Sequence, residues 1–333
     1  MTKNVTRKDV AKLANVSETI VSYVVNNNRY VDKEKKERVL QAIEELQYRP
    51  NPIARSLKGK NSYHILFIAD QIDNEHFGKI VKEIDNLAYE NGYLISLIAN
   101  RNDQNFIDNI ISRQVDGIII NSASFKEEYV EELIANGVPV VLIMMRSYHR
   151  DFEKAGRIYT GVYNGVRNSM RYLSSKGRKN ILYIDRISHR GNFSGDDDLR
   201  MKGFLDEAKA LGYSYGKENV ITGCASEEEA VAKIAETIKS RGNIDGIVGR
   251  NDNMSLLGLK GVELAGKKCP DDIAIIGFDN SRISEYTTPR LTTVEIDRKE
   301  IAKNAMQMIC AQINGEKTSR VDLGTKLIVR EST

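Results

Sequence analysis

The chain is poor in the residues from which redox and metal centres are usually built. Its 333 residues include no tryptophan, five prolines, three cysteines and four histidines. The cysteines at 224, 269 and 310 are odd in number and too far apart for a metal-binding motif, as expected of a protein from a reducing compartment. The histidines at 64, 76, 149 and 189 are equally scattered. We therefore predict that the protein uses no metal and no other cofactor.

Signals for membranes and for catalysis are also missing. No apolar run is long enough to cross a membrane, and the polar N-terminus is no signal peptide, so we predict a cytoplasmic protein without a membrane partner. The motif Gly-x-Gly-x-x-Gly, the P-loop and the nucleophile elbow do not occur. No catalytic residues are therefore indicated, and we predict that the chain is not an enzyme.

The first fifty residues have the pattern of three short helices. Thr6 can cap the first helix, with the acidic Asp9 three residues later, and Asn15 ends it. Ser17 can cap a second helix after a very short turn, and Asp32 can cap a third. The side chains expected to be buried recur at helical spacing: Val10, Leu13 and Ala14, then Val21, Val24 and Val25, then Val39, Leu40, Ile43 and Leu46. This pattern predicts a helix-turn-helix.

Basic residues are concentrated in the same segment. Residues 1 to 60 contain thirteen lysines and arginines and seven acidic residues, a net charge of +6 (13 − 7). The whole chain carries only +3, so the remaining residues sum to −3. An ordinary three-helix unit with a solvated surface is the alternative interpretation. The confined basic excess, taken together with the helix-turn-helix, favours binding to the phosphates of DNA.

These residues are similar to those of LacI-type bacterial transcriptional regulators, and the resemblance covers essentially the whole chain. The N-terminal residues that carry it are Asp9-Val10-Ala11-Lys12-Leu13-Ala14, Val16-Ser17, Val21-Ser22, Arg38-Val39-Leu40, Ala42-Ile43, Tyr48-Arg49-Pro50-Asn51 and Ala54-Arg55-Ser56-Leu57. Weaker matches follow in the expected order: Gly277-Phe278-Asp279-Asn280, Pro289, Leu291-Thr292-Thr293-Val294 and Arg330-Glu331-Ser332-Thr333. The resemblance implies a sequence-specific DNA-binding regulator, which we interpret as a repressor. One small DNA-binding unit makes few base contacts, so we expect a homodimer on a near-palindromic operator.

The resemblance implies that the second helix lies in the major groove, where Glu18, Thr19 and Tyr23 match the base-reading positions. Relatives often have arginine in place of Tyr23, so we expect the guanine contact of such an arginine to be lost. Glu18 can accept from cytosine N4 or act only as a negative charge near the helix N-terminus. We interpret Ser17, Ser22 and Asn26 as phosphate or capping groups. The full set of predicted DNA-binding residues is Thr6, Ser17, Glu18, Thr19, Ser22, Tyr23, Asn26, Arg49, Asn51, Ala54, Arg55 and Leu57.

Residues 50 to 60 resemble the hinge helix and linker of the family. Pro50 and Pro52 prevent the third helix from continuing, and prolines are tolerated in the first turn of a new helix. Leu57 matches the apolar wedge that enters the minor groove beside its copy from a second subunit. Packing of Leu57 on the larger domain is the alternative. So short a helix is unstable alone, so we expect it to fold only on DNA with its partner.

Beyond residue 60, predicted strands alternate with predicted helices. The strands are expected at 63–69, 93–99, 117–121, 138–145, 181–185, 244–248 and 273–278, and the helices at 80–89, 103–113, 127–135, 165–173, 199–211, 227–239 and 253–264. This alternation is typical of parallel sheets with helices on both faces, and about 270 residues need more than one core. We therefore predict an all-α helix-turn-helix domain followed by a two-lobed α/β domain.

The resemblance implies a periplasmic-binding-protein-like core whose two lobes are linked by three crossings. We expect a helix-turn-helix domain at 1–49, a hinge helix and linker at 50–60, and the core at 61–333. One lobe is expected from about 62–161 and 293–320, and the other from about 162–292 and 321–333. A small-molecule effector, a sugar or related metabolite, would bind between the lobes, at the carboxyl ends of parallel strands.

The candidate effector-binding residues lie at strand ends or match family positions: His76, Phe77, Arg200, Asn251, Asp252 and Asp279. Arg200 and Asp279 are the foremost candidates because guanidinium and carboxylate groups make directional hydrogen bonds. The alternatives are that Asp279 caps a turn, that Arg200 is a surface charge, and that His76 only caps or packs.

Departures from the family pattern bear on the effector. Sugar-responsive relatives often have aspartate where this chain has Met144-Met145 and where it has Tyr163, and an aromatic residue where it has Ala225. A standard pyranose site is therefore in question, although a sugar stays the leading expectation. An anionic or phosphorylated metabolite is left open by four nearby residues, His189, Arg190, Arg200 and Lys202. Three aspartates at 196–198 weaken that alternative.

Two other classes of function stay open. The first is a regulator of the same build that is switched by a protein partner, as in catabolite-control members of the family. The second, more distant, is an enzyme on a two-lobed fold, which would require turnover by the core without residues 1–60.

Overall fold

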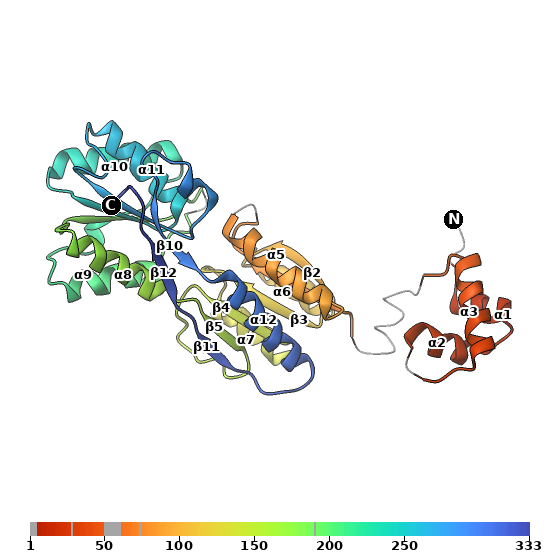
Figure 1. Cartoon of the computed structure of the whole chain (residues 1–333). Helices are drawn as coiled ribbons and strands as arrows, with labels where there is room; N and C mark the ends of the chain where they lie inside the picture. Colours follow the sequence, from red (N-terminus) through yellow and green to blue (C-terminus); the bar gives the residue numbers. More distant parts are fainter. Residues whose placement is uncertain (1–4, 28, 50–60, 73–74, 190) are drawn as a thin grey trace. The chain divides into compact units, whose positions relative to one another are not determined.

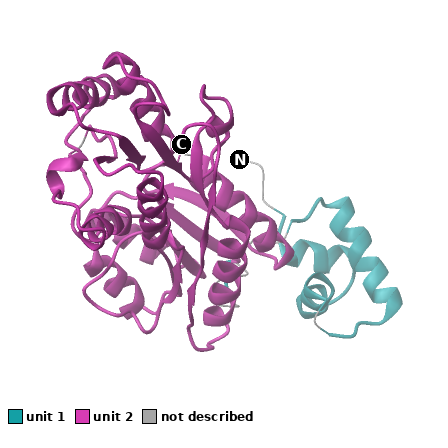
Figure 2. Cartoon of the chain, turned by 60° about the vertical axis from the view of Figure 1, so that its left-hand side comes forward, with its two compact units in different colours: residues 1–62 teal, residues 63–333 magenta. Residues whose placement is uncertain are grey.

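The computed structural model describes residues 5–27, 29–49, 61–72, 75–189 and 191–333. The chain divides into two compact units, residues 1–62 and residues 63–333 (Figure 2). Across the described ranges, every helix is too short or too polar to span a lipid bilayer.

The described residues of the first unit form three short helices (Figure 1), which are α1 (Arg7–Leu13), α2 (Glu18–Asn26) and α3 (Lys33–Glu45). Each helix begins after its predicted capping residue, Thr6, Ser17 or Asp32, whose side chain accepts a hydrogen bond from a backbone amide of the first turn. Asn15 stands in the turn between α1 and α2 with a left-handed φ of 50°. The predicted helix-turn-helix is therefore confirmed.

For two residues of this unit, the prediction that they are buried is wrong. Leu13 and Leu40 are 45% and 49% exposed, whereas Ala11 and Ala42 are buried together with Val10, Val21, Val24 and Val39. Val25 is half-buried. Helical spacing alone leaves open which neighbouring positions turn inward. Small alanines at the contact let helices approach more closely than leucines would.

The second unit contains two six-stranded sheets with helices on both faces (Figure 1). The first sheet has the order β11-β5-β4-β3-β1-β2, and the second has the order β12-β10-β9-β8-β6-β7. The strands of the first sheet are β1 (His64–Ala69), β2 (Leu94–Ala99), β3 (Gly117–Asn121), β4 (Val140–Met144), β5 (Gly156–Tyr159) and β11 (Arg320–Asp322). Those of the second are β6 (Ile181–Ile184), β7 (Val220–Ile221), β8 (Gly246–Gly249), β9 (Ala274–Phe278), β10 (Thr292–Ile296) and β12 (Thr325–Ile328). Neighbouring strands are parallel except β10 and β12, so the predicted α/β class is confirmed.

Alternate strand residues pack on opposite faces of each sheet. One face of the first sheet is covered by α5 (Glu75–Glu90) and α12 (Arg298–Ile313), and the other by α6 (Gln104–Ser112) and α7 (Glu127–Ala135). The second sheet packs in the same way between α8 (Val162–Ser175) with α9 (Leu199–Ala210) and α10 (Glu227–Arg241) with α11 (Asp252–Leu264). The described part of this unit also contains two 3-10 turns, η1 (Lys217–Asn219) and η2 (Arg282–Glu285).

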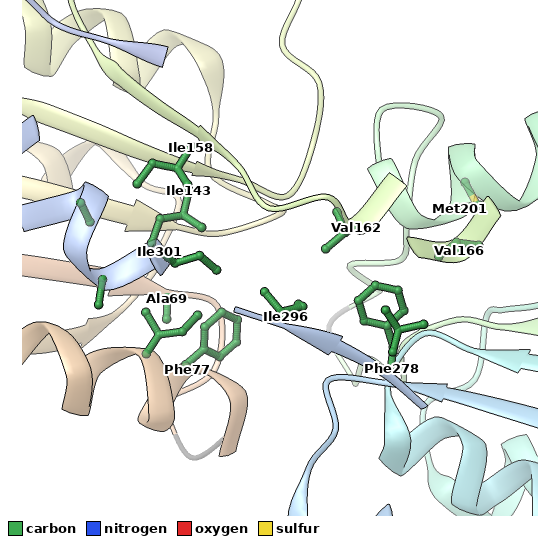
Figure 3. Packing of buried hydrophobic residues seen from close by; sticks show 14 of the residues in the cluster. Ala69, Phe77, Ile143, Ile158, Val162, Val166, Met201, Phe278, Ile296 and Ile301 are labelled. Carbon is green, nitrogen blue, oxygen red and sulfur yellow. The ribbon is translucent and has the colours of Figure 1, made fainter. Parts of the chain in front are cut away.

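One apolar cluster runs through both lobes. Figure 3 shows it extending from Ala69 and Phe77 in the first lobe, past Ile296 on β10, to Phe278 and Val166 in the second. The two lobes therefore share a hydrophobic core on this side.

The chain passes between the lobes three times, after β5, after β10 and after β11. The sequence predicted that the first lobe resumes at 293 and the second at 321. Strand β10 instead pairs with β9 in the second sheet, and β11 pairs with β5 in the first. The second and third crossings therefore come a few residues later than predicted.

Gly161 brings the first crossing against the third. Its φ is +76°, and a Cβ atom there would lie 2.6 Å from the carbonyl oxygen of Leu323 and 3.1 Å from the carbonyl carbon of Gly324. Only glycine combines this backbone conformation with so close an approach.

Asp252 ties α11 to the ends of β9 and β10. Its carboxylate accepts hydrogen bonds from the Thr293 hydroxyl at 2.5 Å and from the Ser281 amide and hydroxyl at 2.6 and 2.7 Å. The residue is 1% exposed. Burial raises the pKa of Asp252 to about 6, although the bonds from Thr293 and Ser281 act in the opposite direction.

We predict that Gly161→Ala destabilises the second unit by about 2–4 kcal/mol, since it adds steric conflict to an unfavourable backbone conformation. Gly177→Ala is the matched control, because Gly177 has a φ of +82° but open space around its Cβ position. That variant should lose only about 1 kcal/mol. Urea unfolding measures both, and equal losses would contradict a close approach at Gly161.

We predict that Asp252→Asn changes how stability depends on pH. The folded-state pKa of about 6 exceeds the ordinary 3.8, so the contribution of Asp252 is fully present below pH 3.8 and is lost as pH rises through 6. Between pH 4 and pH 8 the free energy of unfolding should therefore fall in the wild type, relative to the variant, by roughly 2 kcal/mol. Urea unfolding over this pH range measures the difference, and a difference that does not vary with pH refutes the assignment.

Candidate nucleic-acid interface and ligand site

Helix α2 presents the predicted base-reading side chains. Glu18 and Thr19 are exposed in its first turn and Asn26 in its last, while Ser22 and Tyr23 are half-buried. The Ser22 hydroxyl accepts hydrogen bonds from Arg7 at 3.5 Å and from Asn26 at 3.2 Å. The outer face of α2 is therefore polar, with some of its side chains already positioned by neighbours.

Two of the predicted DNA-binding residues serve as helix caps. Thr6 caps α1 and donates to Asp9 through its hydroxyl at 2.6 Å, and the Ser17 hydroxyl accepts from the Ile20 amide at 3.4 Å. Arg49 is exposed after α3. Four further predicted residues, Asn51, Ala54, Arg55 and Leu57, lie outside the described residues, as does the predicted hinge helix at 50–57.

Three of the predicted effector-binding residues meet in one buried group in the second unit. Asp279 follows β9, Arg200 lies in the first turn of α9, and His76 lies in the first turn of α5. Arg200 donates to Asp279 at 2.9 Å, and the His76 Nδ1 atom is 3.5 Å from the same carboxylate oxygen. All three residues are at most 5% exposed. The group therefore joins an element of the first lobe to two elements of the second.

Arginine side chains keep the carboxylate of Asp279 ionised. Arg298 at the start of α12 donates to the Asp279 carbonyl oxygen, and the Arg200 guanidinium lies 4.6 Å from the centre of the Phe278 ring. Burial opposes ionisation of Asp279, but the positive charges of protonated His76, Arg200 and Arg298 lower its pKa below the ordinary value. Burial lowers the pKa of His76 to about 4. At neutral pH His76 is therefore uncharged, and Arg200 is the cation paired with Asp279.

A second buried set of charges was not predicted. Arg250 donates to Asp198 at 2.7 Å and to the Ser194 hydroxyl at 2.8 Å, and Arg186 donates to the same Asp198 oxygen at 2.8 Å. Ser194 donates to Asp185 at 2.5 Å. Burial would raise the pKa of Asp198, but Arg250 and Arg186 lower it well below the ordinary value. Asp185 and Arg250 directly follow β6 and β8, just as Asp279 follows β9. Their position at the carboxyl ends of strands, the signal that indicated Asp279, therefore indicates them too.

Polar residues follow two strands of the first lobe, and one of them contacts the second lobe. Asp70, after β1, accepts from the Ala123 amide at 2.8 Å and the Ser124 hydroxyl at 2.6 Å. Arg146, after β4, forms an ion pair with Asp197 of the second lobe. The Arg282 amide of the second lobe donates to Glu75 of the first at 3.0 Å. The lobes are thus joined by polar contacts as well as by the shared core.

The other three effector candidates have structural partners. Phe77 is 9% exposed and packs in the shared apolar cluster (Figure 3), with its ring edge-on to His76 at 5.3 Å between centroids. Asn251 caps α11 by accepting from the Met254 amide at 2.9 Å. Asp252 makes the hydrogen bonds to Thr293 and Ser281 described above.

The basic residues that left an anionic ligand open are not gathered around Arg200. Lys202 pairs with Asp206 one turn along α9 at 3.1 Å, and His189 is exposed. Arg190 lies outside the described residues. The guanidinium groups that act on the same carboxylate as Arg200 come instead from the buried Arg250 and the half-buried Arg298.

The lobe junction therefore combines guanidinium, carboxylate, hydroxyl and imidazole groups. Such groups form directional hydrogen bonds to a polar ligand. Among the described residues, no cluster of histidine, cysteine or carboxylate side chains has the arrangement of a metal site.

Comparison with protein families gives two matches. The model "Bacterial regulatory proteins, lacI family" matches residues 6–51, and "Periplasmic binding protein-like domain" matches residues 170–333. The HTH-type transcriptional repressor PurR of Pectobacterium carotovorum is 29% identical over 98% of this chain and 96% of its own length. Catabolite control protein A of Priestia megaterium is 30% identical over 99% of both chains.

Solved structures have the same fold. The lac repressor dimer bound to operator and the anti-inducer ONPF superposes with a TM-score of 0.84 at 22% identity, covering 99% of each chain. The complex of the transcriptional regulator CelR with cellobiose has a TM-score of 0.72 at 23% identity, covering 99% of this chain and 100% of the other. This chain is 30% identical to one member over its full length, and its own helix-turn-helix matches the family model. The chain therefore belongs to the lacI family of bacterial regulatory proteins, whose members are DNA-binding transcriptional regulators and not enzymes.

Proposed function

We propose that this chain is a homodimeric repressor whose affinity for a near-palindromic operator is switched by a small-molecule effector bound at the lobe junction. The observation that carries the proposal is the meeting of His76, Arg200 and Asp279 in one buried group that spans both lobes. A ligand that exchanges hydrogen bonds with this group favours one lobe arrangement over another, which is all that coupling requires.

The DNA-binding part of the proposal rests on α2. Glu18, Thr19 and Tyr23 select the bases, and Ser17, Ser22 and Asn26 hold the helix in register on the phosphates. Thr6 supports this by capping α1. The remaining assigned positions lie next to or within the hinge, at Arg49, Asn51, Ala54, Arg55 and Leu57, with Leu57 as the minor-groove wedge.

The effector part rests on the charged groups of the lobe junction. We assign ligand contact to His76, Arg200 and Asp279. Asn251 and Asp252 act indirectly, through the cap of α11 and the hydrogen bonds to Ser281. Solved family members are described with cellobiose, lactose and ribose, so a sugar or a related polar metabolite is the first ligand class to test.

A regulator switched by a protein partner is the second candidate function. It is favoured by the 30% identity to a catabolite control protein A over 99% of both chains. Thermal melting against a panel of sugars and sugar phosphates separates the two candidates. A rise in melting temperature with one compound, together with a change in operator affinity, supports the small-molecule switch. Operator binding that depends on a co-purifying protein, without any such rise, supports the partner.

We predict that Asp279→Asn weakens binding of the responsive compound at least tenfold while operator affinity without it changes less than threefold. The amide keeps the shape of the side chain but loses the charge that orients Arg200. Glu331→Gln is the control, because Glu331 pairs with Arg290 at an exposed site. Calorimetric titration and gel shifts measure the two affinities. An unchanged compound affinity in Asp279→Asn overturns the assignment of this site.

We predict that Leu57→Ala lowers operator affinity at least tenfold, because a methyl group is too small to hold a base step open. Leu264→Ala, which changes a 55% exposed leucine of the second unit, should leave it unchanged. Gel shifts on the same operator fragment compare the variants, and equal affinities would show that Leu57 is no wedge.

A further inference from the structure

Arg29 is held against the base-reading helix by a side chain of that helix. It follows α2 in the chain, and its guanidinium carbon lies 5.2 Å from the centre of the Tyr23 ring. Its Nη1 atom also donates a hydrogen bond to the Tyr23 hydroxyl at 3.3 Å. Stacking and hydrogen bonding together fix the plane of the guanidinium.

The surroundings of Arg29 suit DNA. A surface cavity of about 260 Å³ is lined by Tyr23, Arg29, Tyr30, Lys33 and Lys36, among others. Tyr30 is 93% exposed, the most exposed of the large apolar side chains in the described part of the chain. Among the described residues Arg29 has no carboxylate partner and donates one side-chain hydrogen bond, to Tyr23, so most of its five N–H donors are open to a ligand.

We propose that Arg29, positioned by Tyr23, is a specificity-determining residue that reads a guanine in each operator half-site. The proposal rests on the DNA-binding function of α2. Arginine recognises guanine through two parallel hydrogen bonds to O6 and N7, which needs an oriented planar group. Because Arg29 follows α2 and lies over Tyr23, the guanidinium is supplied from beside the helix instead of from the helix itself.

Tyr23 thereby takes part in base selection through Arg29, as the residue that positions it. Its ring carries the arginine, and ordering Arg29 before DNA binds reduces the entropy lost on binding. Lys33 and Lys36 line the same cavity, but a lysine is a flexible point charge that suits phosphate better than a base edge. The cavity therefore combines one oriented cation with two unoriented ones.

The test uses the full-length protein and a pool of random double-stranded DNA. Selection with the wild type identifies the bound site, and a set of duplexes with each base pair changed in turn then measures base preference. We expect Arg29→Ala to lose at least tenfold affinity for the selected site and to lose the preference for guanine at one position of each half-site. Arg29→Lys, which keeps the charge, should lose the same preference. Lys36→Ala is the matched control and should weaken all duplexes equally.

Other outcomes overturn the proposal. If Arg29→Ala weakens every duplex by the same factor, Arg29 contacts phosphate, and if it changes nothing, Arg29 does not touch DNA. If the wild type selects no DNA, the proposed function fails with it, whereas a wild type that selects a site while Arg29→Ala keeps the same preference refutes this inference alone.

The role of Tyr23 is tested by a double-mutant cycle. Tyr23→Ala should lose the same guanine preference as Arg29→Ala, and combining the two should add less than twofold to either loss. Tyr23→Phe keeps the ring but removes the hydrogen bond, so it should lose only about two- to threefold. Circular dichroism checks that each variant is folded. Fully additive losses would mean that Tyr23 contacts DNA independently and does not position Arg29.

Discussion

The buried carboxylate of Asp279 is the group on which the arrangement of the second unit depends. A charge that is 5% exposed is tolerated only with partners, and its partners come from three helices. Arg200 arrives on α9, His76 on α5, and Arg298 on α12, where it holds the Asp279 carbonyl. The backbone at Asp279 has a φ of 95°, which directs the chain away from β9 toward η2. Two helices of the first lobe and one of the second are therefore placed by a single residue.

This constraint differs in kind from the other links between the lobes. The crossings near Gly161 and Leu323 are covalent and persist in any lobe arrangement. The Arg146–Asp197 pair is partly exposed, and contacts of this type contribute little each, so they can break and re-form. The buried Asp279 group is less permanent than the covalent crossings but harder to break than the exposed pair, since removing one of its partners leaves an uncompensated charge. A ligand that supplies a replacement partner there changes the balance between arrangements far more than one that displaces a surface pair.

Local features of the sequence predicted most strands and, among the described residues, every helix except α12. Caps such as Thr6, Ser17 and Asp32 act within one turn, so their effect is independent of the rest of the fold. Strand β5, with Arg157 in it, was missed because it is short and is defined by its pairing with β4 and β11. At the lobe junction, Asp279, the partner of Arg200, was predicted because it directly follows a strand. Asp185 and Arg250 also follow strands, but their meeting through Ser194 and Asp198 depends on how residues 185–198 fold back, a feature with no local signature.

The N-terminal unit separates affinity from specificity. Its excess of basic residues attracts any DNA, and such attraction weakens steeply as salt is raised. In the proposed function, base recognition falls to a few side chains around a helix of nine residues. In the proposed homodimer each of these side chains acts twice, so the effect of one contact on affinity is squared. A reading surface as small as α2 and the turn after it is therefore sufficient, provided that each contact is held in a fixed orientation before DNA binds.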